Sequence, residues 1–503
     1  MMGWKSGLVL TWVLALPLPA LAQDSEPKTL EQITPEIDAL FARFKAEAHV
    51  PGMVYGVVRD SELAYVKGIG VQDLKDKRAV TADSRFRIAS MTKAFTALSI
   101  LKLRDDGKLR LDDLAEQHIP EMKGWVYPTT DSPRIRIRDL LHHVGGLVTD
   151  DPWGDRQQIL PQDVFTKMIA AGVPFSRAPQ SQHEYSNFGY ALLGRIVAKV
   201  SGMAYTDYVQ QTILTPLGMT GSGFDVTQTP KARYARGYRW ENDAWTPEPE
   251  MIDGAFNSMG GLQVSANDYA KWIAFLLSAW PARDDADTGP VRRATVREMA
   301  QGLNFVTVAN RIGASGATAC KQAAAYAMGW RVAQDCDLGL TLAHGGGYPG
   351  YGSHVMLMPD HGVGVFALSN RTYAGPSAPA WDSAVAMHKA GLLVGRAVPV
   401  TPAVADAFAA ARAAYAAGNL APLQGKLAMN FLLDRSAENW VAELARLKAA
   451  VGDCPTAEPL APSGGMSATF RLNCTKGRLD GMLLLAPTTP VTVQSLRFRV
   501  AVP

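Results

Sequence analysis

The segment SMTK, residues 90 to 93, lies where an extended apolar stretch passes directly into a helix, and this junction constrains the fold most. Residues 86 to 89 are typical of a strand, and residues 94 to 98 continue as a helix. Residues three apart on a helix share a face, so the Ser90 hydroxyl and the Lys93 amine are expected within reach of each other. The helix start also offers free N–H groups and the positive end of the helix dipole. The junction predicts an activated nucleophile, although the spacing also suits a helix cap followed by a solvated lysine.

Tyr185 and Asn187 stand in a loop that leads into a second helix. They belong to the segment HEYSNFGYALLG, residues 183 to 194, in which the apolar residues then repeat at helical spacing. A phenol at this place suits proton transfer, and an amide suits the positioning of a neighbouring group. The alternative is structural: Tyr185 packs at the helix entry with its hydroxyl in water, and Asn187 only caps the helix.

His344 follows an apolar run and opens a run of three glycines, residues 345 to 347. Two further apolar segments, residues 355 to 358 and 363 to 368, are joined by the turn PDHG, which predicts strand, turn and strand. His344 is therefore expected to end or line an edge strand, where glycines let a substrate approach the backbone closely. The alternative is a hydrogen-bonded polar residue beside a plain turn.

In this order, the motifs S-x-x-K, Y-x-N and H-x-G resemble those of the class C serine β-lactamase family, which includes penicillin-binding proteins, esterases and peptidases. Other similar stretches are LLHHVGGL at 140 to 147 and PLGM at 216 to 219, so that the resemblance extends over residues 30 to 395. It implies an α+β fold of the β-lactamase/transpeptidase type: an antiparallel sheet flanked by helices, with a helical subdomain.

The motif residues can be given roles in acyl transfer. Ser90 is expected to attack a carbonyl and form an acyl-enzyme, and burial is expected to lower the pKa of Lys93 so that it can accept the serine proton. Tyr185 is the other candidate base, if neighbouring positive charge makes its phenol acidic. Which of the two takes the first proton stays open. Asn187 is expected to fix Lys93 and a substrate carbonyl.

The third motif, H-x-G at residues 344 to 346, indicates which class of substrate the protein accepts. The resemblance implies an oxyanion hole made by the backbone N–H groups of Ser90 and Gly347, with Gly346 also contacting substrate. Many class C β-lactamases carry lysine where this chain has His344, which is charged only near or below its usual pKa of about 6.5. We therefore expect an esterase or D-amino-acid peptidase acting on a small ester, amide or peptide. The alternatives are a β-lactamase or D,D-carboxypeptidase, or a penicillin-binding sensor without turnover.

Residues 1 to 22 are predicted to be a signal peptide. Lys5 precedes the apolar residues 7 to 18, and small residues up to Ala22 form a cleavage site. The segment is short and contains two prolines, which argues against a membrane span, although an uncleaved anchor is the alternative. The mature protein is thus expected to be secreted or periplasmic, with no stable membrane span.

The four cysteines fall into two local pairs, Cys320 with Cys336 and Cys454 with Cys474. An even number in an exported chain suggests disulfides, and proximity in sequence favours these two among the three possible connectivities. Four free thiols are the alternative.

A boundary is expected near the segment VPVTP, residues 398 to 402. Residues 23–398 would form the hydrolase domain and residues 403–503 a small accessory α+β domain. Its helices are expected at 403 to 417 and 439 to 451, and its strands at 467 to 474, 479 to 485 and 491 to 500.

Composition and missing motifs narrow the function further. The formal net charge is only +3 and like charges do not cluster, so neither nucleic acid nor an anionic membrane is expected as a partner. The sequence holds no Cys-x-x-Cys, H-E-x-x-H or P-loop pattern, so no metal or nucleotide cofactor is expected. The adjacent His142 and His143 point different ways, and His143 is interpreted as a structural hydrogen-bonding residue. The oligomeric state is left open.

Overall fold

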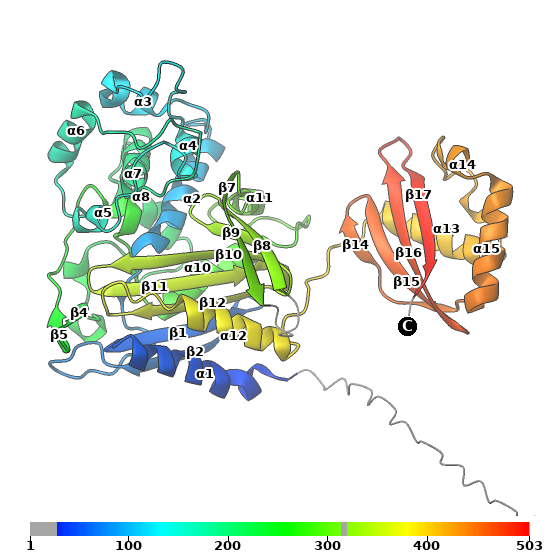
Figure 1. Ribbon diagram of the computed structural model, residues 1–503, viewed down its shortest axis with the longest axis horizontal. Helices are drawn as coiled ribbons and strands as arrows, with labels where there is room; N and C mark the ends of the chain where they lie inside the picture. Colours follow the sequence, from blue (N-terminus) through cyan, green and yellow to red (C-terminus); the bar gives the residue numbers. More distant parts are fainter. Residues whose placement is uncertain (1–27, 313–318, 502–503) are drawn as a thin grey trace, which may run out of the picture.

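The computed structural model describes residues 28–312 and 319–501 of the 503-residue chain, and the predicted signal peptide lies outside them. An eight-stranded antiparallel sheet organises the chain up to residue 398, with the strand order β2-β1-β12-β11-β10-β9-β8-β7 (Figure 1). Its strands are β1 Gly52–Arg59, β2 Glu62–Gly70, β7 Asn304–Ile312, β8 Ala319–Tyr326, β9 Arg331–Asp335, β10 Gly339–Tyr348, β11 Tyr351–Met358 and β12 Val363–Ser369.

Helices cover both faces of this sheet, which is why most residues of its central strands are buried. All seven residues of β12 are buried, as expected for a strand with two covered faces. One face packs against α1 and α12, with Ile37 and Phe41 of α1 in the same core cluster as Val57 and Val365 of the sheet (Figure 1). The other face packs against α10 and α2.

A helical region lies beyond one end of the sheet, with α2 running from the sheet into it (Figure 1). Eleven of the fourteen residues of α2 are buried, because helices surround it on most sides. The helices up to residue 398 are α1 Leu30–Glu47, α2 Thr92–Asp105, α3 Ala115–His118, α4 Ile137–Leu141, α5 Trp153–Arg156, α6 Gln162–Ala171, α7 Asn187–Ser201, α8 Tyr205–Val209, α9 Asn257–Gly260, α10 Ala266–Leu277, α11 Arg293–Glu298 and α12 Ser377–Lys389. Two short two-stranded sheets pair β3 Phe86–Arg87 with β6 Gln263–Val264, and β4 Tyr238–Glu241 with β5 Ala244–Pro247.

The C-terminal part forms a second sheet with a core of its own. The strands are β13 Thr456–Ala457, β14 Ala461–Gly464, β15 Ser467–Cys474, β16 Gly477–Ala486 and β17 Thr492–Val500, and the helices are α13 Pro402–Ala417, α14 Phe431–Asp434 and α15 Ala437–Val451. Residues such as Val404, Leu447 and Leu483 share one cluster that contains no residue from before position 403. The α+β fold with an additional C-terminal sheet is thus confirmed, while the boundary itself stays a prediction.

Cys454 and Cys474 form a disulfide, as predicted. Cys336 is also disulfide-bonded, but the side chain of its predicted partner Cys320 lies outside the described part of the chain, so that pairing stays a prediction. Among the helices of the described residues, none has both the length and the apolar character needed to cross a membrane.

Candidate active site

Ser90 lies in a single 3-10 turn, Ala89–Met91, that joins the short strand β3 to the helix α2. The side chain of Ser90 is buried, with 6% exposed. Ala89 has a φ of +50°, in the left-handed region that a residue with a Cβ rarely adopts. Such a conformation persists where the surrounding structure fixes it, and here the pairing of β3 with β6 and the buried helix α2 do so.

The Lys93 side chain is fully buried directly beneath Ser90. Its Nζ donates hydrogen bonds to Ser90 Oγ at 3.0 Å, to Asn187 Oδ1 at 2.7 Å and to the Met259 carbonyl at 2.7 Å. An ammonium group has three donors, so each of them has an acceptor. Lys93 is therefore held in one geometry, with one of its N–H groups on the serine oxygen.

Burial lowers the pKa of Lys93 to about 8, although the carboxylates of Asp151, Asp155 and Asp150 oppose the shift. The cause is desolvation, which disfavours the charged form of a buried amine. A neutral amine is thus accessible near neutral pH. In that form the Nζ lone pair can accept a proton from Ser90.

Asn187 is the first residue of α7, and two acidic residues hold it there. The Asp150 carboxylate accepts the backbone N–H groups of Asn187 at 2.6 Å and Phe188 at 2.7 Å, which caps the positive end of the helix. Asn187 Nδ2 donates to Asp151, and its Oδ1 accepts from Lys93. Neither aspartate was predicted, because their only signal in the sequence is an acidic pair before a proline.

Tyr185 lies beside Ser90 and Lys93, just before α7. Lys93 Nζ is 4.9 Å from the centre of the Tyr185 ring. Burial and the nearby Asp151 raise the pKa of Tyr185 well above its usual value, and the influence of the Ser90 side chain only partly offsets this. The sequence had suggested that positive charge nearby could lower the pKa of this phenol. The pKa is raised instead, so Tyr185 carries its proton.

The strand β10 is not an edge strand, contrary to the prediction. β9 pairs with its first half, from Gly339 to Ala343, because β7, β8 and β9 extend the sheet beyond it. Within the described residues, however, the stretch from His344 to Tyr348 pairs with β11 alone. The second half of β10 is thus a local edge, and its outer backbone groups face away from the sheet.

The His344 ring is buried and uncharged. Nδ1 donates to the Gly345 carbonyl at 2.6 Å, which leaves Nε2 to accept from the Tyr326 hydroxyl at 2.9 Å. Burial, reinforced by the charge of Lys93, lowers the pKa of His344 to about 3. His344 therefore does not supply the positive charge that a lysine would bring to this position.

The glycines after His344 differ in their surroundings. A Cβ on Gly346 would overlap the Ser353 hydroxyl and the Ile88 carbonyl, so β10 packs directly against the segment that carries Ser90. A Cβ on Gly347 would lie 2.6 Å from the Tyr373 ring. Gly347 follows Gly346 on β10, the strand that contacts the 3-10 turn of Ser90; the oxyanion hole stays a prediction.

Two aromatic residues complete the surroundings of Tyr185. The His143 ring lies 4.3 Å from that of Tyr185 and 4.6 Å from that of Tyr326, measured between ring centres. His143 Nδ1 accepts the Ser186 N–H at 3.1 Å, and burial lowers the pKa of His143 well below its usual value. This contact is of the structural kind expected for His143. Tyr326 was not predicted because it ends β8, a strand whose sequence contains no motif.

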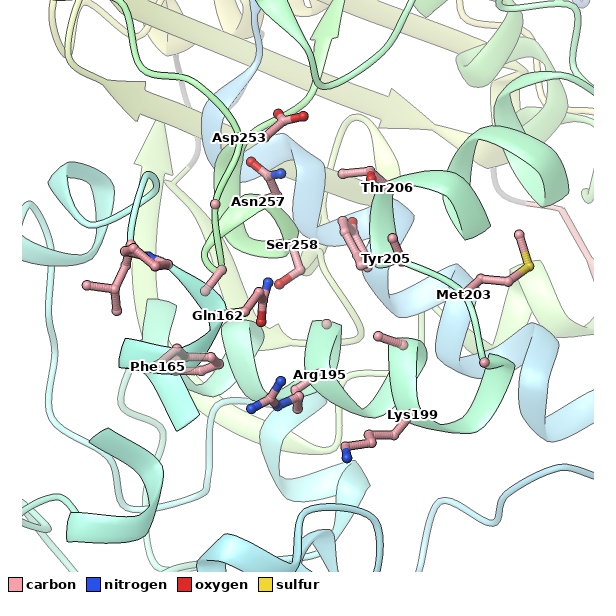
Figure 2. Close-up of a pocket in the computed structure, with 18 residues that line it drawn as sticks. Gln162, Phe165, Arg195, Lys199, Met203, Tyr205, Thr206, Asp253, Asn257 and Ser258 are labelled. Carbon is pink, nitrogen blue, oxygen red and sulfur yellow. The ribbon is translucent and has the colours of Figure 1, made fainter. Parts of the chain in front are cut away.

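A cavity of about 710 Å³ lies beside α6, α7 and α9, and Figure 2 shows its walls. Arg195 and Lys199 of α7 line one side of it, and Asp253 lies opposite (Figure 2). None of the predicted catalytic residues lines this cavity. It is separate from the reacting groups, although its wall residue Ser258 adjoins Met259, the acceptor for Lys93.

Within residues 28–312 and 319–501, one group of side chains has the composition of a metal site. Donor atoms of Asp335, Cys336 and Asp337 lie within 4.8 Å of one another. A cysteine binds a metal ion as a thiolate. Cys336 is disulfide-bonded, so the group lacks its sulfur ligand.

The sheet, the helical region and the placement of Ser90 in the turn before α2 define a fold of the β-lactamase type. The chain belongs to the β-lactamase family, whose model matches residues 37–388. It is 29% identical over 343 residues to Protein flp of Staphylococcus aureus (strain COL), which covers 67% of this chain and 62% of that protein. It is also 32% identical over 281 residues to Beta-lactamase-like protein 2 of Dictyostelium discoideum, covering 54% of this chain and 50% of that protein. The chain thus spans less than two thirds of the length of these relatives.

Solved structures share the fold at lower sequence identity. The octameric penicillin-binding protein homologue from Pyrococcus abyssi is similar with a TM-score of 0.59 and 20% identity, covering 92% of this chain and 99% of that one. A class C β-lactamase from Rhodobacter sphaeroides is similar with a TM-score of 0.54 and 21% identity, covering 70% of this chain and 99% of that one. The larger coverage of the first extends into the C-terminal part of this chain.

Proposed function

We propose that this protein is an exported serine hydrolase that cleaves an ester or amide bond through an acyl-enzyme on Ser90. The supporting observation is the buried Lys93, whose Nζ lies 3.0 Å from Ser90 Oγ and whose pKa is lowered to about 8. A nucleophile beside a base of this kind is the arrangement that acyl transfer requires. Export is supported by the signal-peptide pattern and by the disulfide Cys454–Cys474.

Acylation begins with neutral Lys93 as the base. Ser90 Oγ bonds to the substrate carbonyl carbon while its proton passes to Lys93 Nζ, and the carbonyl oxygen becomes an oxyanion. The N–H groups of Ser90 and Gly347 stabilise that charge in the proposed oxyanion hole, where one donor is typically worth about 100- to 1000-fold in rate. The pKa directions favour Lys93 over Tyr185 as this base, because the phenol holds its proton.

Tyr185 then serves as the acid. The bond to the leaving oxygen or nitrogen breaks as the Tyr185 proton moves to that atom, and the proton that Lys93 took from Ser90 then restores the phenol. In the second half of the reaction a water oxygen bonds to the acyl carbon while Lys93 takes a proton from the water. The bond between that carbon and Ser90 Oγ then breaks, the acid leaves, and Lys93 returns the proton to Ser90 Oγ. Asn187 keeps Lys93 in place through its Oδ1 and needs no protonation change.

Neutral His344 supports an esterase or amino-acid peptidase rather than an efficient β-lactamase. A substrate carboxylate finds no cation at His344, whose pKa is lowered to about 3. A penicillin or cephalosporin carries such a carboxylate, whereas a simple ester does not. We therefore propose faster cleavage of short p-nitrophenyl esters than of a chromogenic cephalosporin.

A fluorophosphonate probe tests the nucleophile. Labelling of the purified protein is expected at Ser90, with loss of labelling in Ser90→Ala and retention in the matched control Ser181→Ala, an exposed serine. Labelling that persists in Ser90→Ala would refute the assignment.

The substrate preference is tested by comparing kcat/KM for p-nitrophenyl acetate and for a chromogenic cephalosporin. A higher value for the cephalosporin would overturn the esterase or peptidase preference. A burst of one product per protein without further turnover would instead indicate a binding or sensor protein.

A further inference from the structure

Carboxyl groups outnumber cations around Ser90. Asp150, Asp151 and Asp155 all act electrostatically on Lys93, which is the one cation in direct contact with the serine among the described residues. His344 adds no positive charge, since its pKa lies at about 3. The field in the site therefore favours a substrate that brings positive charge and disfavours one that brings a carboxylate.

Asp155 differs from the other two aspartates because half of its carboxyl group has no partner. Its side chain is 2% exposed, and Oδ2 accepts from the Tyr373 hydroxyl at 3.1 Å. Oδ1 is buried and accepts no hydrogen bond from any described residue. Lys93 cannot fill this role, since its three donors are engaged by Ser90, Asn187 and Met259. A buried oxygen without a donor is unfavourable, so Asp155 Oδ1 is suited to a donor that arrives with the substrate.

Contacts on both sides place Asp155 within the site. Its neighbour Gly154 packs so closely on Asn187 that an added Cβ would lie 2.6 Å from the Asn187 Cβ. On the other side, the Tyr373 hydroxyl donates to Asp155 Oδ2, and the Tyr373 ring covers Gly347. Asp155 thus lies between the residue that holds Lys93 and the glycine of the proposed oxyanion hole.

The position along β10 indicates which part of the substrate Asp155 faces. His344 and Tyr185 are neighbours, with ring centres 6.3 Å apart, and Tyr185 protonates the leaving group in the proposed reaction. Gly347 lies three residues further along the strand, about 10 Å away at the usual rise. Asp155 is linked to the Gly347 end and is therefore on the side of the acyl group.

We propose that Asp155 binds a protonated amino group on the acyl part of the substrate, so that the enzyme acts on esters and amides of amino acids whose amino group is free. This inference rests on the proposed function. An ammonium group brings both the charge and the donor that Asp155 Oδ1 lacks, and a hydrogen bond between two charged groups is among the stronger ones. Burial raises the pKa of Asp155 to about 7 despite the nearby Lys93, as expected for a carboxyl group awaiting a partner.

The test compares alanine p-nitroanilide with N-acetylalanine p-nitroanilide, in both D and L forms, at pH 8. Acetylation removes the charge and leaves the rest of the acyl group in place. We expect kcat/KM of the wild type to favour the free amine by roughly 10- to 100-fold, the range for one hydrogen bond to a buried charge. In Asp155→Asn this ratio should fall about tenfold or more, whereas Asp163→Asn, an exposed aspartate of α6, should keep it.

A second measurement does not depend on a variant that folds. Alanine amide and N-acetylalanine amide are compared as inhibitors of p-nitrophenyl acetate hydrolysis by the wild type, and the free amine should inhibit at a roughly tenfold lower concentration. Equal or weaker inhibition by the free amine, or an unchanged ratio in a folded Asp155→Asn, would overturn the proposal. If p-nitrophenyl acetate is still cleaved and Ser90 is still labelled, only this inference fails; if neither occurs, the proposed function fails.

Discussion

Replacing Asp151 by asparagine is expected to lower the pKa of Lys93 and to shift the pH dependence of the enzyme. Asp151 accepts a hydrogen bond from Asn187 Nδ2, while Asn187 Oδ1 accepts from Lys93 Nζ at 2.7 Å. The carboxylate of Asp151 is the foremost of the charges that favour protonated Lys93. Asparagine has the same shape and can still accept from Asn187, so Asp151→Asn removes mainly the charge.

The magnitude follows from the distance. One amide group with a hydrogen bond on each side separates the carboxylate from Nζ by about 6 Å. At this distance two unit charges interact by about 0.7 kcal/mol in water and about 2.8 kcal/mol at an effective dielectric constant of 20. These energies correspond to about 0.5 to 2 pKa units. Because Asp151 is exposed to solvent, we expect the lower part of the range, about 0.5 to 1 unit.

The assay is kcat/KM for p-nitrophenyl acetate, an uncharged substrate, between pH 5.5 and 9. If neutral Lys93 is the base, the wild-type rate rises with pH through a midpoint near 8. The midpoint should fall by about 0.5 to 1 unit in Asp151→Asn, which makes the variant about three- to fivefold faster at pH 7. Asp163→Asn should leave the profile unchanged, and high salt should shrink the difference. A midpoint that stays or moves upward in Asp151→Asn would refute Lys93 as the base.

Three further predictions concern stability. Gly346→Ala should lower the free energy of unfolding in urea by about 1 to 3 kcal/mol, because the new Cβ overlaps neighbouring atoms. In the control Gly345→Ala the atom nearest to the new Cβ is 3.7 Å away, so the change should stay within about 0.5 kcal/mol. Equal effects of the two substitutions would contradict the packing. The pKa of His344 is about 3 in the folded chain and about 6.5 in the unfolded chain, so between these values only the unfolded state binds the proton. The free energy of unfolding should therefore decrease by about 2 kcal/mol as the pH is lowered from about 7.5 to about 5. His344→Gln should lose that part of the acid sensitivity, and a variant as acid-sensitive as the wild type would argue against a neutral buried ring. The Cys454–Cys474 disulfide joins residues 20 apart, so replacing both cysteines by serine should cost about 3 kcal/mol; an unchanged unfolding transition in calorimetry of the whole chain would show that the bond does not constrain the unfolded state.

Local patterns in the sequence were sufficient for most secondary structure. The strands 355 to 358 and 363 to 368 and the C-terminal helix 403 to 417 lie within β11, β12 and α13. Alternation and helical spacing are properties of neighbouring residues, so they can be recognised without tertiary contacts. The strands β7 to β9 were not foreseen, and their absence from the sequence analysis led to the wrong placement of β10 at an edge.

By itself, the sequence determined the order of the three motifs, the β-lactamase type of fold and the disulfide Cys454–Cys474. The tertiary structure alone decided how the groups near Ser90 ionise: Tyr185 keeps its proton, His344 is neutral and Lys93 can lose its charge near neutral pH. It also brought Gly154 against Asn187 and Asp155 against Tyr373, from segments far apart in the chain. The physical reason is that desolvation and Coulomb interactions depend on what surrounds a group in space, and no spacing of residues along the chain records those surroundings.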